Sequence, residues 1–342
     1  MRKVLLLIGL LLCLSLPAQA MDYTAPTVPD LQQADTESFS EGLSKVLGKA
    51  VAILDPSLKE AGAACLGLVG IVLLYSLLET LPANMKPVTG FVTTLTVSAI
   101  LLSRTNSLIS LGVSTVSKLS DYGKLLLPIM TAAMAAGGGV TSATALYAGT
   151  TLFDMVLGIL ISKFLVPLVY IFLILAIASA ATDSDRLGKL RDLTKSFIAW
   201  AMKILIYIFT GYIAITGVIS GNADATALKV TKLTMSGMIP VVGGILADAS
   251  ETVLVSAGVM KNAVGTYGVL AVLSVWIAPF VQIGAQYLLL KLTATLCAAF
   301  GAKEPTKLME QFSAALGLLL GMTATMCLLL LVSTVCFMRG VG

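Results

Sequence analysis

Long stretches of this chain contain no ionisable residue. The stretches Leu125–Phe153, Asn262–Leu290 and Gln311–Met338 each lack Asp, Glu, Lys and Arg. A helix of about 20 apolar residues is long enough to cross the hydrocarbon core of a bilayer. Four shorter stretches are equally free of charge: Ala61–Leu78, Pro87–Ser103, Phe164–Thr182 and Ile204–Ala223. The sequence therefore predicts a chain that crosses a membrane several times.

The composition supports this class and argues against several others. Hydrophobic residues make up 57% of the 342 residues and charged residues only 12%, whereas soluble domains average about 25% charged residues. There is no histidine, which removes the commonest general base and metal ligand. The five cysteines lack C-x-x-C spacing. No catalytic motif is present, so we expect no enzyme activity, no cofactor, no metal site and, with a net charge of only +4, no nucleic-acid binding.

The N-terminus has the three parts of a secretory signal. Arg2 and Lys3 are followed by a short apolar run and then by Ala18-Gln19-Ala20, which predicts a signal peptide over 1–20; an uncleaved first anchor is the alternative. Residues 21–60 form a short extracytoplasmic arm, in which the spacing of apolar residues predicts an amphipathic helix over 38–54 that ends at Pro56. The polytopic membrane domain takes up 61–342.

The predicted fold class is all-α, with seven or eight transmembrane helices and two broken-helix or re-entrant regions. Pro128 and three glycines interrupt the apolar residues at 125–139, which leaves the number of helices at seven or eight. The expected spans are 64–81, 88–103, 140–161, 164–181, 197–219, 267–290 and 312–338.

Basic residues in short loops predict the orientation. The expected loop 182–196 carries four of them, so we place it in the cytoplasm, and Lys303 and Lys307 agree with this placement. A cleaved signal places the mature N-terminus outside, and with eight spans both basic segments then lie inside and the C-terminus outside. Lys229, Lys232 and Lys261 also fall outside, so the rule is only partly obeyed.

The first candidate site contains Pro128 and the run Gly137, Gly138 and Gly139. One interpretation is a broken helix whose free backbone groups line a pathway or contact a partner. The other is a glycine-rich turn between two closely packed helices.

The second candidate site contains Pro240, Gly243, Gly244, Asp248 and Glu251. The two carboxylates are three residues apart, so a helix would place them on one face. They either attract cations or a basic partner, or they only complement the dipole of a helix that starts after the glycines.

Asp154 is the third candidate, because it lies deep within an otherwise apolar predicted span. An acidic residue there is costly and points to function by default. Alternatively, the span ends earlier and Asp154 is close to an interface. The pairs Pro128/Pro167 and Pro240/Pro279 share a 39-residue separation, which suggests an internal repeat such as transporters often have.

Two stretches, LPIMTAAMAAGGGVTSATALYAG (127–149) and GMIPVVGGILADASETVLVSAGVMKNAVG (237–265), resemble the stage III sporulation protein AE family. The resemblance covers about 60–340. It implies a subunit of a sporulation channel or secretion-type complex in the mother-cell membrane around the forespore, needed for late forespore gene expression. The implied partners are the other proteins of the stage III sporulation operon, including a secretion-type ATPase, and a forespore membrane protein. The arm at 21–60 is short for the family.

Other interpretations stay open on the residues alone. A stand-alone secondary transporter or permease would use Asp154 and the two broken regions, and a structural scaffold would have no pathway of its own. Whether several copies of the chain assemble is also open.

The signal peptide is directly testable. Because Ala18 and Ala20 form a small-x-small cleavage site, N-terminal sequencing of the protein purified from membranes should begin at Met21. Recovery of an N-terminus at Met1 would contradict cleavage.

Overall fold

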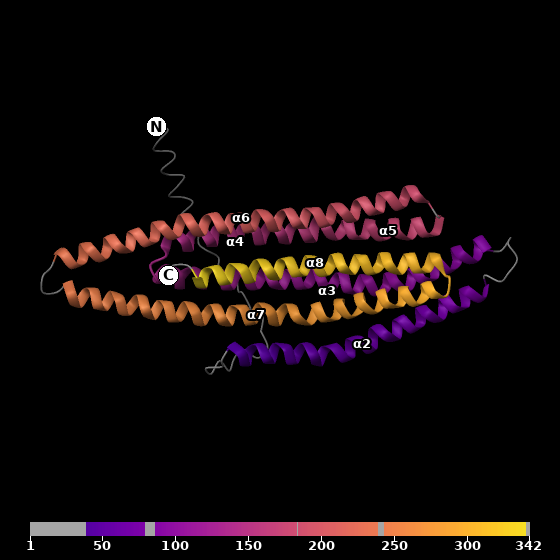
Figure 1. The fold of residues 1–342 in the computed structure, drawn as a ribbon, viewed down its shortest axis with the longest axis horizontal. Helices are drawn as coiled ribbons and strands as arrows, with labels where there is room; N and C mark the ends of the chain where they lie inside the picture. Colours follow the sequence, from indigo (N-terminus) through magenta and orange to yellow (C-terminus); the bar gives the residue numbers. More distant parts are fainter. Residues whose placement is uncertain (1–38, 79–85, 183, 239–242, 340–342) are drawn as a thin grey trace, which may run out of the picture. The chain divides into compact units, whose positions relative to one another are not determined.

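The structure, a computed structural model, describes residues 39–78, 86–182, 184–238 and 243–339, and the side chains of these residues except 78, 86–89, 217–262 and 339. The predicted signal peptide and residues 21–38 of the arm lie outside this part of the chain. The described residues form helices without strands, as predicted (Figure 1). In chain order these are α2 (Phe39–Leu78), α3 (Lys86–Ala136), α4 (Val140–Ile159), a π-helical turn η1 (Leu160–Leu165), α5 (Val166–Thr182), α6 (Asp185–Met238), α7 (Gly243–Ala299) and α8 (Lys303–Arg339).

The helices are longer and fewer than the sequence predicted. Among the described residues, five helical segments are long and apolar enough to cross a membrane: α2, the run from α4 to α5, α6, α7 and α8. The predicted spans 140–161 and 164–181 belong to one continuous run, and α6 contains the span 197–219 and continues beyond it to Met238. With 54 residues, α6 is about 80 Å long at 1.5 Å per residue. The prediction of seven or eight separate spans is therefore not confirmed.

Two prolines that we expected to end or break helices lie inside them. Pro56 is within α2 and Pro128 within α3, so the predicted helix end at Pro56 is wrong and Pro128 does not break its helix. A proline costs about 3 kcal/mol inside a helix, but packing against neighbouring helices supplies most helical stability in proteins. Here α2 packs along α7, and α3 packs along α8 and α7.

A third proline explains the π-helical turn. Pro167 has no N–H to donate to the carbonyl of Lys163, four residues earlier, and its ring would clash with that carbonyl. The helix widens over Leu160–Leu165 immediately before it, which gives the chain room to continue as α5.

Pro240, one of the four prolines of the repeat hypothesis, lies outside the described residues, so the repeat stays a prediction.

The glycine run ends α3 and turns the chain into α4. The amide of Gly139 donates to Met134 O over 3.1 Å and that of Gly138 to Ala135 O over 3.0 Å. Gly138 has φ 90°, which glycine adopts without steric cost. This is the Schellman arrangement for closing a helix. The backbone at 137–139 therefore forms a glycine-rich turn between two helices, which is the second of the two interpretations of this run.

Helix α8 is the centre of the bundle. It contacts α3, α4, α5, α6 and α7, whereas α2 packs mainly on α7 and α3. Buried side chains make up 56% of the most apolar window of α8, against 17% in α6. Phe312, Met322 and Phe337 of α8 are fully buried. The last helix in the sequence therefore organises the others (Figure 1).

The outer surface and the interior have the polarity expected in lipid. Large apolar side chains such as Leu66, Ile174 and Ile215 are more than 60% exposed, which in water would be a large unfavourable patch. Buried Ser and Thr hydroxyls donate to the carbonyl one turn earlier in their own helix, as Ser98 does to Thr94 O and Thr334 to Leu330 O. This arrangement confirms the prediction of a multi-pass membrane protein.

A glycine contact between α4 and α6 gives a stability test. A Cβ at Gly149 would overlap the ring of Tyr212, whose hydroxyl donates to Ala145 O over 2.7 Å. Gly149→Ala should destabilise the fold by about 1–3 kcal/mol through overpacking, measured as earlier thermal unfolding in detergent. The matched control is Gly158→Ala on the same helix, where a Cβ has open space. Equal effects of the two changes would contradict this packing.

Candidate functional site

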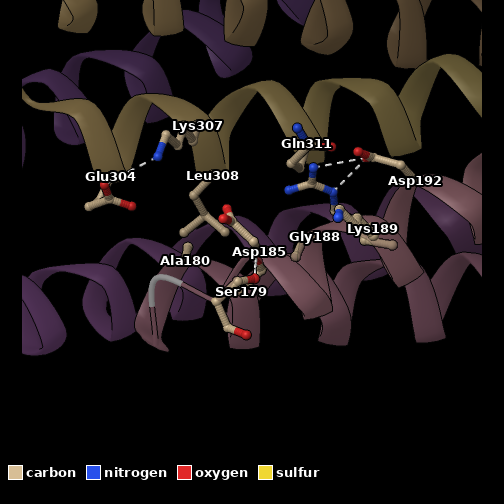
Figure 2. Close-up of a pocket in the computed structure, with 13 residues that line it drawn as sticks. Ser179, Ala180, Asp185, Gly188, Lys189, Asp192, Glu304, Lys307, Leu308 and Gln311 are labelled. Carbon is tan, nitrogen blue, oxygen red and sulfur yellow. Dashed lines mark hydrogen bonds and ion pairs between the residues drawn. The ribbon is translucent and has the colours of Figure 1, made fainter.

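A charged cavity lies where α5 ends and where α6 and α8 begin. It has a volume of about 440 Å³. Our expectation of a loop over 182–196 is wrong, because α6 starts at Asp185. The basic residues of that segment lie on the first turns of a helix, and Lys307 of α8 lines the same cavity (Figure 2). The structure therefore brings together two segments that the sequence placed on one side of the membrane.

The side chains that line this cavity carry equal numbers of positive and negative charges. Arg191 donates from both Nε and Nη2 to Asp192 Oδ1 over 2.9 Å, and Lys307 donates to Glu304 Oε1 over 3.4 Å. The Arg191 side chain is 17% exposed, so this guanidinium is held largely inside. Asp185 and Lys189 complete three acids and three bases (Figure 2). A balanced set of this kind suits a polar partner surface or a zwitterionic group better than a simple anion.

A tight connection between α5 and α6 shapes the cavity wall. Ser179 Oγ donates to Ser184 O over 3.3 Å, and the amide of Ser184 donates to Ser179 O over 3.4 Å. A Cβ on Gly188 would lie 3.4 Å from Ser179 Oγ, an ordinary contact distance, so the start of α6 lies directly beside the end of α5. Ala176, Ala180 and Leu308 make the apolar part of the lining.

Asp154 occupies a different environment, inside the bundle. Its side chain is 4% exposed, and it is the one ionisable residue among the buried polar residues that the structure describes. Ser120 of α3 donates to its Oδ2 over 2.6 Å, while its Oδ1 is buried without a hydrogen-bond partner. An ionised Asp in the middle of a membrane helix costs about 3 kcal/mol on insertion scales.

Further hydroxyls lie close to Asp154 along α4. Thr150, one turn earlier, donates to Ser333 Oγ of α8 over 3.1 Å, and the buried Thr151 Oγ1 has no partner. A Cβ on the buried Gly123 of α3 would lie 3.6 Å from Asp154 Oδ1. The same Cβ would lie 2.9 Å from Leu330 Cδ2 of α8, so the junction of α3, α4 and α8 holds one carboxylate, several hydroxyls and the Leu330 side chain.

The other predicted site residues are placed only in part. Pro128 and Gly137–Gly139 belong to the helical interior and the turn described above. Pro240 lies outside the described residues. Gly243, Gly244, Asp248 and Glu251 lie on the first turns of α7, but their side chains are not among those described, so their role stays a prediction.

The sequence showed Asp154 but not its partners. Ser120 lies 18 residues before Gly138 and Asp154 lies 16 residues after it, so a hairpin of two helices about this glycine places them at one level. Thr150 and Ser333 are ordinary residues of apolar helices, and nothing in the sequence indicates that their hydroxyl groups meet. The cavity residues Ser179, Gly188 and Gln311 were missed for the same reason.

Comparison with known proteins points to one family. The family model for stage III sporulation protein AE matches residues 30–340. A curated relative, stage III sporulation protein AE of Bacillus subtilis (strain 168), is 28% identical over 187 residues, which are 54% of this chain and 47% of the relative. The chain thus spans about half the length of the relative it matches. No solved structure matches the chain.

The charged cavity gives a test of orientation. Since basic residues favour the cytoplasmic side, a single cysteine at Ser184, which lines the cavity, should react with an impermeant maleimide only after cells are permeabilised. The control is Val140→Cys, at the opposite end of the run from α4 to α5 and 58% exposed, which should label in intact cells. Labelling at Ser184→Cys in intact cells would reverse the orientation.

Proposed function

The chain belongs to the stage III sporulation protein AE family, and from this membership we propose that it is a membrane-embedded subunit of a channel or secretion-type complex that links mother cell and forespore. The complex supports late forespore gene expression. The observation that carries the proposal is the family match over 30–340, nearly the whole chain. The family has a role in sporulation and is not a known family of enzymes.

The location of the proposed complex is the mother-cell membrane around the forespore. Five membrane-competent helices and their exposed apolar side chains support a subunit that lies in a bilayer. The other proteins of the stage III sporulation operon are the proposed partners, with a secretion-type ATPase on one side and a forespore membrane protein on the other. The charged cavity offers polar, partly exposed groups to a partner outside the lipid.

A stand-alone transporter or permease is the second candidate, and Asp154 is the observation that favours it. A buried carboxylate with a free oxygen inside a membrane bundle is a common element of ion and substrate pathways. The two candidates differ in what they need. A transporter works as purified protein in liposomes, whereas a subunit of a complex requires its partners.

Deletion of the gene in its endospore-forming host tests the proposal. We expect the count of heat-resistant spores to fall and a late forespore reporter to be lost, while an early forespore reporter and engulfment stay normal. The wild-type gene should restore both losses.

Point variants in the same assay test the second candidate site. Gly243→Leu, or Asp248→Ala combined with Glu251→Ala, should accumulate in the membrane yet fail to restore spores, because the region is proposed to contact a partner or pathway. Leu328→Ala, at an exposed apolar position of α8, is the control and should restore spores.

Normal sporulation of the deletion strain itself would contradict the proposed function.

A further inference from the structure

We propose that the junction of α3, α4 and α8 at Asp154 is a binding site for a small monovalent cation, either a proton or Na⁺. The inference concerns the isolated protein and does not depend on the sporulation role. Asp154 is the one ionisable side chain among the buried polar residues of the described chain.

The first argument is the incomplete coordination of the carboxylate. Ser120 Oγ donates to Oδ2 over 2.6 Å, but Oδ1 is buried without a partner. A buried carboxylate with a bare oxygen is strongly disfavoured, because no water replaces the missing hydrogen bonds. A cation on Oδ1 removes this penalty.

The second argument is a further unpartnered oxygen on the same helix. Thr151 Oγ1 is also buried without a partner, and it lies three residues before Asp154, a spacing that places side chains side by side. Thr150, one turn before Asp154 and linked to Ser333 over 3.1 Å, adds two hydroxyl oxygens to the junction. Oxygen ligands of this kind suit hard cations.

The third argument concerns the neighbours of Oδ1 and their charge. Gly123 and Leu330 lie on this side of the carboxylate, since a Cβ on Gly123 would be 3.6 Å from Oδ1 and 2.9 Å from Leu330 Cδ2. The charged groups nearest to Asp154 on α3 are Asp121 and Lys124, which form an ion pair with each other at 2.9 Å and so cancel. On α8, Leu330 and Ser333 face this junction and carry no charge. The single negative charge of Asp154 is then left uncompensated. A monovalent cation neutralises it, whereas a divalent cation leaves a net positive charge.

Two measurements on the purified full-length protein in nanodiscs test the site and separate the two ions. For a proton, the infrared spectrum should contain the C=O stretch of a protonated carboxyl, and Asp154→Asn should lose it. For Na⁺, the unfolding temperature should rise with NaCl relative to choline chloride at equal ionic strength, as binding to the folded state requires, and Asp154→Asn should lose this rise. Either result supports the site and identifies the ion.

The matched control is Asp55→Asn, the same change on an exposed carboxylate of α2, which should alter neither measurement. If Asp154→Asn does not fold, Ser120→Ala replaces it. This variant keeps the carboxyl and removes its hydrogen-bond donor, so it should shift the frequency of the carboxyl band or weaken the Na⁺ effect. A wild-type protein with no protonated-carboxyl band and no Na⁺-dependent stabilisation would overturn the proposal.

Discussion

The apolar surface that the long helices turn to the lipid is the constraint on which this structure depends. A backbone group without a partner costs several kcal/mol in hydrocarbon, so a spanning segment must satisfy its own hydrogen bonds. The helices do so over 40 to 57 residues in α2, α3, α6 and α7. Buried Ser and Thr side chains follow the same rule, since Thr115 and Thr293 donate to the carbonyl one turn earlier.

Close packing is the second consequence of the lipid environment, because burial of apolar groups from water does not hold helices together there. Small residues allow the close contacts that hold the helices together instead. Gly112 lies against Leu319 of α8, Gly149 against Tyr212 of α6 and Gly268 against Leu126 of α3. Each contact leaves no room for a Cβ. Helix α8, which packs against five others, depends on such contacts along its length.

Asp154 departs from this pattern, and its position connects structure to function. It lies in the part of the bundle where α3, α4 and α8 meet, with Ser120 as its hydrogen-bond donor. The charged cavity lies at the end of the bundle where α5, α6 and α8 approach each other. Helix α8 contributes to both places, through Lys307 and Leu308 at the cavity and through Ser333, which accepts a hydrogen bond from Thr150, at the junction.

The sequence by itself determined the membrane class, the all-helical fold, the family resemblance and the exceptional character of Asp154. Each of these follows from composition or from local pattern: charge-free runs, the two quoted motifs, and one acid in an apolar segment. Helix ends were less predictable. Pro56 and Pro128 are local signals for a break, yet packing along α7 and α8 outweighed them.

Only the tertiary structure decided which residues meet. The distance from Ser120 to Asp154 depends on the register of α3 against α4, which the turn at Gly138 sets. The junction with Ser333 depends on α8, nearly 180 residues further along the chain, packing against both α3 and α4. Such contacts depend on how whole helices pack, and no local pattern in an apolar segment specifies that packing, because one face of Leu, Val and Ala residues resembles another.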